Sequence, residues 1–262
     1  MASPIANTFS VWLIVLFLQS ILYGIGLLQV WLYFLWYPRD SWGTKGTVAL
    51  ITVLETFQSV VYFMACYQIF ITNFDNLPAL AVISWLPCAQ LGALYASTFV
   101  VQGFFGYCIY NLHQKRPILP AAIALFALAA FGSGLAQVVL AARIKFWADL
   151  GSTSVRYFTY CPSTFMNGVT QAATNTQAAF ALAADILIIV GLCWPLNRSR
   201  TEIQATNRMI NFLIIMAVNR GVLTMITALI NIVLFLAKPG TFYFMLMVES
   251  SGKLYMNNMM AT

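Results

Sequence analysis

Two oppositely charged side chains stand near the middle of the apolar C-terminal stretch, residues 241–262. Glu249 and Lys253 are four residues apart, so on a helix they share one face and lie about 6 Å apart along its axis. Asn257 extends that face by another turn. A charge at the centre of a bilayer costs at least ~2.5 kcal/mol, so such residues point into the protein. Two interpretations stay open: the pair neutralises itself and fixes helix packing, or it forms one wall of an intramembrane site.

Three further ionisable residues lie within apolar stretches, namely Glu55, Asp185 and Arg220. Together with Glu249 and Lys253 they nearly balance in charge, as a buried network requires. Arg220 could meet either Glu249 or Asp185, because helices joined by short turns usually pack against each other. A carboxylic acid surrounded by hydrocarbon can stay protonated, which suits general-acid chemistry. Glu55 and Glu249 are therefore the catalytic candidates if the chain is an enzyme.

Uncharged polar residues follow helical steps in the same stretches. One stripe on the second apolar segment contains Glu55 and Tyr62, and one on the third contains Tyr95 and Gln102. These stripes and the charged groups predict a polar cavity inside a helix bundle. The predicted ligand-binding residues are Tyr62, Tyr95, Gln102, Asp185, Arg220, Lys253 and Asn257.

Cysteine and histidine spacing argues against a metal site. The chain has five cysteines without a CxxC pair and a single histidine, His113, so we expect no metal and no cofactor. Cys88 and Cys161 both fall on the expected outer side, where a disulfide would pin a loop over the bundle, although two free thiols are the alternative. Lys253 in a last helix is also the position of a retinal Schiff base. The third segment lacks a carboxylate and the sixth lacks a tryptophan, which disfavours retinal.

Composition places the chain in a membrane. It has 262 residues, of which 61% are hydrophobic and 8% charged. A water-soluble domain carries about a quarter charged residues, so this chain could not cover a soluble surface. The lipid bilayer is the expected partner, and the net charge of +6 is not a nucleic-acid footprint, because the basic residues lie between apolar segments.

The apolar segments predict an all-α bundle of seven transmembrane helices in one domain, 1–262. They lie near residues 8–37, 46–72, 83–110, 118–142, 169–196, 209–236 and 241–262. Basic residues are more numerous in the first, third and fifth connections than in the others, which places the N-terminus outside and the C-terminus in the cytoplasm. The long connection from Arg143 to about Gly168 is a candidate lid or binding loop. The host membrane would be the plasma membrane or the endoplasmic reticulum.

The last two segments resemble a known family. The run TNRMINFLIIMAVNRGVLT and the ending ESSGKLYMNNMMAT are similar to the C-terminal half of a large basidiomycete-type fungal family of multi-pass membrane proteins of unknown function. That family typically ends in SKLYxNSxLATLN; here Gly252 replaces the serine of SKL and Asn258 replaces the later serine. The chain stops inside the ATLN motif, so we expect that a cytoplasmic tail was removed. The resemblance implies an architecture and no activity.

Three functions are compatible with these features. The first is a receptor or sensor that binds a small apolar or lipid-like ligand and signals to a cytoplasmic partner. Against the main heptahelical receptors, the third segment ends in Tyr110-Asn111 rather than an Asp-Arg-Tyr motif. The second is a membrane-embedded enzyme similar in layout to fungal terpene cyclases, with intramembrane acids. The third is a transporter of protons or a small solute.

Overall fold

The computed structural model describes residues 4–73, 85–113, 116–143, 168–198 and 243–260, together with residues 222, 226, 229 and 230. Within these residues the chain is all-helical, with six α-helices. They are α1 (Pro4–Trp36), α2 (Trp42–Tyr67), α4 (Trp85–Leu112), α5 (Ile118–Arg143), α7 (Gly168–Arg198) and α9 (Tyr243–Met260). A π-helical turn, Gln68–Thr72 (η1), continues α2. These bounds lie within a few residues of those expected from the sequence.

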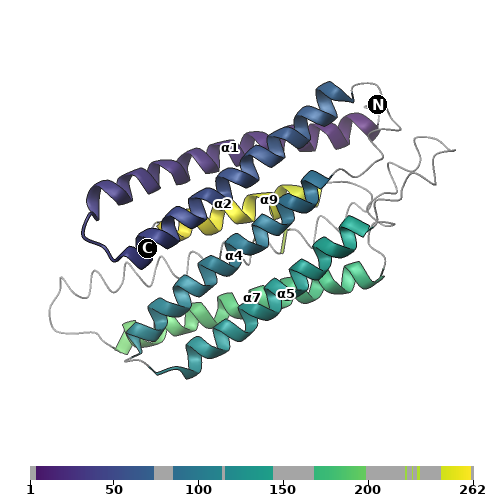
Figure 1. Ribbon diagram of the computed structural model, residues 1–262. Coiled ribbons are helices and arrows are strands. Elements are labelled where there is room, and N and C mark those ends of the chain that lie inside the picture. Colours follow the sequence, from purple (N-terminus) through teal and green to yellow (C-terminus); the bar gives the residue numbers. More distant parts are fainter. Residues whose placement is uncertain are drawn as a thin grey trace.

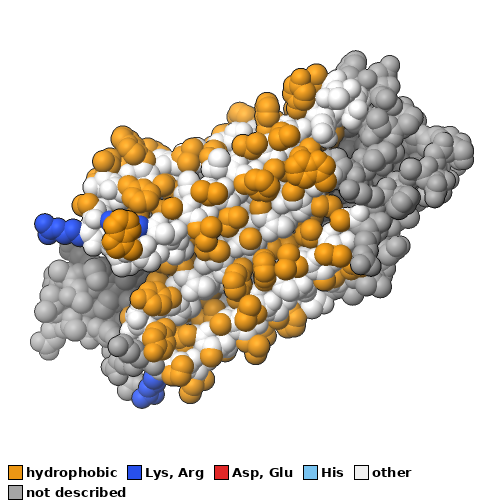
Figure 2. Space-filling view, in the orientation of Figure 1, with side chains coloured by type: hydrophobic (Ala, Val, Ile, Leu, Met, Phe, Trp, Pro, Cys, Tyr) orange, Lys and Arg blue, Asp and Glu red, His pale blue; other side chains and the backbone are white. Residues whose placement is uncertain are grey.

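Five segments of the described chain are long and apolar enough to cross a membrane. They are Ser10–Trp36, Trp42–Thr72, Trp85–Leu112, Ile118–Leu140 and Asn175–Cys193. Large apolar side chains such as Phe17 and Leu125 point outward along them, and Figure 2 shows apolar side chains spread along the length of one face. The described residues thus form a multi-pass membrane protein, because no soluble protein would expose so much apolar surface to water.

The prediction of seven spanning helices is met only in part. The last predicted segment does fold into α9, but it is not among the five spans. It carries Glu249, Lys253 and two asparagines within 18 residues. The predicted sixth helix, 209–236, lies outside the described residues except for four positions, which are helical. The candidate lid between α5 and α7 also lies outside them.

The helices run side by side along one long axis, with α9 inside the bundle (Figure 1). α9 packs on α1, α2 and α4, and α4 in turn packs on α5 and α7. The burial pattern follows this arrangement: α1 buries few residues, whereas α4 is buried along its length. α9 therefore occupies the place where polar side chains from several helices can meet without contacting lipid.

The turn between α1 and α2 is fixed by its sequence. Pro38 cannot continue α1, because proline has no amide N–H to donate. Ser41 caps α2, its hydroxyl oxygen accepting a hydrogen bond from the Thr44 amide at 3.3 Å. The Lys45 ammonium donates to the Pro38 carbonyl at 2.6 Å. These contacts set the register between α1 and α2, and with it the depth at which Glu55 lies.

Candidate functional site

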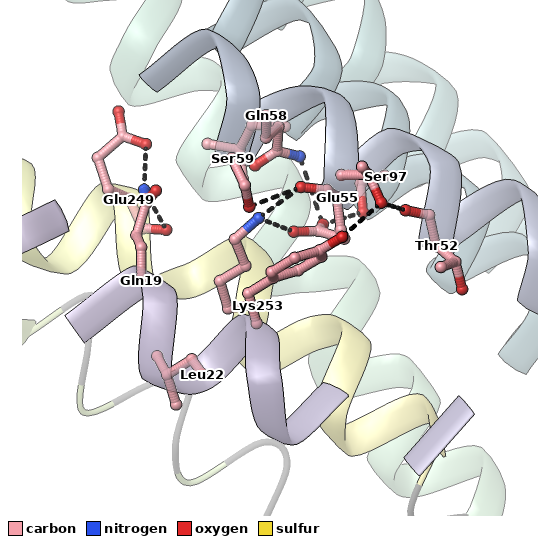
Figure 3. A network of polar contacts seen from close by, with 12 residues as sticks. Gln19, Leu22, Thr52, Glu55, Gln58, Ser59, Ser97, Glu249 and Lys253 are labelled. Carbon is pink, nitrogen blue, oxygen red and sulfur yellow. Dashed lines mark hydrogen bonds and ion pairs between the residues drawn. The ribbon is translucent and has the colours of Figure 1, made fainter. Parts of the chain in front are cut away.

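A buried ion pair joins α9 to α2. The Lys253 Nζ lies 2.8 Å from the Glu55 Oε2, and both side chains are fully buried. The same ammonium donates to the backbone carbonyl of Glu55 at 2.8 Å and lies 5.3 Å from the centre of the Tyr23 ring on α1. Figure 3 shows the lysine reaching from α9 to the carboxylate on α2. The pair is thus enclosed by three helices and shielded from lipid.

The Glu55 carboxylate is held from a fourth helix, α4, as well. The Ser97 hydroxyl on α4 donates to its Oε1 at 2.6 Å, and the Gln58 amide donates to the same oxygen at 3.3 Å. Lys253 forms its ion pair with Glu55 on α2 and not with Glu249 on its own helix. The reason is geometric: α2 packs directly on this face of α9, and there the lysine gains both the carboxylate and a backbone carbonyl.

Glu249 has a separate environment built from neutral amides. The Gln19 Nε2 on α1 donates to its Oε2 at 3.0 Å, and also lies 3.4 Å from its backbone carbonyl. The Gln90 Nε2 on α4 donates to the same Oε2. In Figure 3, Glu249 and Gln19 lie apart from the ion pair of Lys253 and Glu55. Glu249 therefore ties α9 to α1 and α4 through hydrogen bonds rather than through an ion pair with a described residue.

Asp185 forms a third cluster between α4, α7 and α9. The Gln102 Nε2 on α4 donates to its Oδ1 at 3.2 Å and to the Ala181 carbonyl at 3.3 Å. The Tyr255 hydroxyl on α9 donates to its Oδ2 at 2.6 Å. All three side chains are buried. Three predicted acids thus lie inside the bundle. Glu249 belongs to α9, Glu55 contacts Lys253 of α9, and Asp185 contacts Tyr255 of α9.

Two other predicted site residues lie at helix contacts, where Tyr62 is buried and Asn257 is half-buried. The Tyr62 ring stacks on Trp12 with centroids 5.5 Å apart, and its hydroxyl donates to the Trp12 carbonyl at 3.3 Å. The Asn257 amide donates to the Leu22 carbonyl at 3.2 Å. A Cβ added at Gly26 would lie 2.8 Å from the Asn257 Oδ1, so α1 and α9 approach each other closely at this glycine.

Tyr95 and Gln102 share a crevice between α4, α5 and α7. The crevice is too narrow to admit a water molecule. It is lined by Tyr95, Thr98, Phe99, Gln102, Ala127, Ala130, Phe131 and Gln177. The Gln102 Oε1 is buried and accepts no hydrogen bond from the described residues, although the Nε2 of the same amide is engaged with Asp185. An unpaired buried acceptor in a mostly apolar wall fits a hydrogen-bond donor on an apolar molecule.

Some predicted residues cannot be placed. Arg220 and Cys161 lie outside the described residues, so the predicted contact of Arg220 with an acid and the disulfide with Cys88 stay predictions. Cys88 itself is buried in α4. Within the described part of the chain, no group of three or more histidine, cysteine or acidic side chains could hold a metal ion.

Sequence reasoning missed three partners of the buried acids, namely Gln90, Ser97 and Tyr255. Gln90 and Ser97 are seven residues apart on α4, so they share one helix face and form a polar stripe that could have been detected. Uncharged residues carry a weaker signal than acids, because a glutamine or serine on an apolar helix often only satisfies a local contact.

Comparison with known protein families finds a similarity over the C-terminal part of the chain. A family of unknown function (DUF6534) matches residues 181–262, which include most of α7 and all of α9. The match covers the part of the chain that carries Asp185, Glu249 and Lys253. No curated protein and no solved structure matches the chain. The C-terminal third, including the helix that all three buried clusters share, is therefore similar to that family.

Proposed function

We propose that the chain is a receptor- or sensor-like membrane protein for a small apolar or lipid-like ligand that carries one hydrogen-bond donor. The observation that supports this proposal is a buried hydrogen-bond acceptor, the side-chain oxygen of Gln102, in a residue that lines the crevice. Its Oε1 is buried without a hydrogen bond from a described residue, and leaving such an acceptor unpaired costs about 1–3 kcal/mol. A ligand hydroxyl or amine would supply the missing donor, while Phe99 and Phe131 would contact its apolar part.

Ligand binding at Gln102 would reach α9 in two contacts. The Gln102 Nε2 holds Asp185 at 3.2 Å, and Asp185 accepts from Tyr255 on α9 at 2.6 Å. A ligand that reorients the Gln102 amide would weaken its bond to Asp185 and change how Asp185 holds Tyr255. α9 is the responsive element in this proposal, because a ligand can act only by binding two arrangements with different affinities. The closed crevice is the ligand-free arrangement, which a ligand would have to open.

The proposal includes a topology. Seven helices in a single domain 1–262, with the N-terminus outside, would place the connections α1–α2 and α4–α5 in the cytoplasm. Arg39 and Lys45 lie in or beside the first of these connections and Arg116 lies in the second. In Figure 2 the blue side chains of the described part of this face lie only at that end of the bundle. Such an excess of basic residues supports a cytoplasmic location for that end, where a signalling partner would bind.

The enzyme alternative receives less support from the geometry. Glu55 would have to act as an acid, but its Oε2 lies 2.8 Å from the Lys253 Nζ and is already engaged in an ion pair. Transport of protons or a small solute would use the same buried acids. Transport is the second candidate, because Glu249 has no ion-pair partner among the described residues.

Matched ligands test the receptor proposal. The chain in lipid nanodiscs is heated with isoprenoid or fatty alcohols and, in parallel, with their methyl ethers, which have the same apolar body and no donor. Alcohols are expected to raise the melting temperature, since a ligand at about 100 times its Kd adds about 2.7 kcal/mol to stability. The ethers are not. Hydrogen exchange of residues 243–260 should change with the alcohols, which would report the response of α9.

Two variants and one control locate the effect. Gln102→Leu removes the acceptor, and Ala130→Leu fills the crevice and leaves Gln102 intact; both should abolish stabilisation by alcohols. Leu128→Phe enlarges a side chain that is 56% exposed on the lipid-facing side of α5, and should leave it unchanged. Equal stabilisation by alcohols and ethers, or an unchanged effect in Ala130→Leu, would contradict the proposal. Conversion of an isoprenoid into a new product would support the enzyme alternative instead.

A further inference from the structure

The carboxyl group of Glu249 is buried in α9, and the described residues that donate hydrogen bonds to it are neutral amides. Its side chain lies between α1 and α4, and the residue is 7% exposed. The Gln19 amide donates to Oε2 at 3.0 Å, and the Gln90 amide donates to the same oxygen. No described residue donates a hydrogen bond to Oε1. The two carboxyl oxygens are therefore in different environments, one with two donors and one with none.

The nearest lysine along the helix is already committed elsewhere. Lys253 lies one turn from Glu249 on α9, yet its Nζ lies 2.8 Å from the Glu55 Oε2 and donates to the Glu55 carbonyl at 2.8 Å. None of the lysines and arginines that the structure describes forms an ion pair with Glu249. A carboxylate without a counter-ion in an apolar interior is strongly disfavoured relative to the neutral acid.

We propose that Glu249 is a proton-binding site, and that its carboxyl group carries a proton on Oε1 in the folded bundle at neutral pH. Protonation converts the carboxylate and one proton into a neutral acid, with no other reactant. Oε2 remains the carbonyl oxygen and still accepts both amide hydrogen bonds, so the links from α9 to α1 and α4 are kept. The proton is bound to Oε1, the oxygen that accepts no hydrogen bond from a described residue.

The ionisable groups around Glu249 determine what loss of the proton would do. Glu55 and Tyr62 on α2, Tyr95 on α4 and Lys253 on α9 all interact with its charge, as does the thiol of Cys66 on α2. The phenols and the thiol are ordinarily uncharged at neutral pH. Among these groups Lys253 alone is a base, so an ionised Glu249 would compete with Glu55 for the same ammonium. The proton on Glu249 thereby supports the ion pair between α9 and α2.

Infrared difference spectroscopy in lipid at neutral pH tests the proposal. The wild-type chain should show the carbonyl band of a protonated carboxylic acid, and the band should disappear in Glu249→Gln. The same band should remain in the double variant Glu55→Gln with Lys253→Met, which removes the neighbouring acid together with the lysine that would otherwise be free to pair with Glu249. A wild-type spectrum that loses no such band in Glu249→Gln would overturn the proposal. A band that forms only after sodium is removed would also overturn it, because the site would then bind sodium.

A second measurement covers the case in which Glu249→Gln does not fold. Glutamate labelled with ¹³C at the side-chain carboxyl, in the wild-type chain, gives separate NMR signals for ionised and neutral acids. One glutamate signal is expected at the neutral-acid position at neutral pH, and it should move when the pH is raised. If all glutamate signals lie at the ionised position, the proposal fails without reference to any variant.

Discussion

Breaking the ion pair between α9 and α2 should destabilise the bundle strongly, and replacing both partners should not. At the observed separation of 2.8 Å the gross attraction is about 6 kcal/mol with an effective dielectric constant of about 20. Desolvation of the two ions offsets much of this attraction. A single substitution leaves one buried charge unpaired, and we expect Glu55→Gln or Lys253→Met to cost about 3–5 kcal/mol. In Glu55→Gln the lysine would still reach the backbone carbonyl, so the cost should lie near the lower value.

The double variant Glu55→Gln with Lys253→Met isolates the pair. It removes both charges at similar volume, and its stability should exceed that of either single variant by about 3 kcal/mol. Reversible unfolding in mixed detergent micelles gives the four free energies of the cycle. Additive effects, with the double variant destabilised by the sum of the two single costs, would refute the view that the two charges stabilise each other.

Two further substitutions probe contacts around the site. Gly134→Ala should destabilise the chain by about 1–3 kcal/mol, because the added Cβ would lie 2.6 Å from the Tyr95 ring. Its control is Gly132→Ala, where no atom lies within 4 Å, and which should be neutral or stabilising by up to ~1 kcal/mol in the same unfolding assay; equal effects at the two glycines would contradict the packing. Tyr255→Phe removes the hydroxyl that donates to Asp185, and should cost about 1.5–3 kcal/mol and increase hydrogen exchange in α9. Unchanged stability and exchange would show that this hydrogen bond does not hold α9.

Much of the helix layout could be predicted from the sequence. Apolar runs long enough to cross a bilayer predicted the positions of six helices, and Pro38 predicted where the first of them ends. Such runs must be helical in lipid, because a helix satisfies its backbone hydrogen bonds internally. The inward stripe on α2 was predicted for the same reason: Glu55 and Tyr62 lie on one face at helical steps, and both are buried. These features depend on local spacing alone.

The partners across helices could not be predicted. Spacing showed that Lys253 could reach Glu249 on its own helix, but whether Glu55 lies closer depends on which helix packs against that face of α9. Such pairings are set by long-range packing, which one sequence does not specify. The predicted ligand-binding residues Tyr62 and Asn257 donate to backbone carbonyls of a neighbouring helix, a contact that a polar side chain in a membrane bundle can make as readily as one with a ligand.

The charged groups that the structure describes in the apolar segments, Glu55, Asp185, Glu249 and Lys253, converge inside the bundle on α9. Solid-state NMR of the chain in lipid bilayers measures this directly, with ¹⁵N at lysine Nζ and ¹³C at the glutamate side-chain carboxyl. We expect a dipolar coupling between a lysine Nζ and a carboxyl carbon that disappears in Glu55→Gln and persists in Glu249→Gln. The absence of any such coupling in the wild-type chain, or a coupling that disappears in Glu249→Gln and persists in Glu55→Gln, would contradict the arrangement on which the proposed site depends.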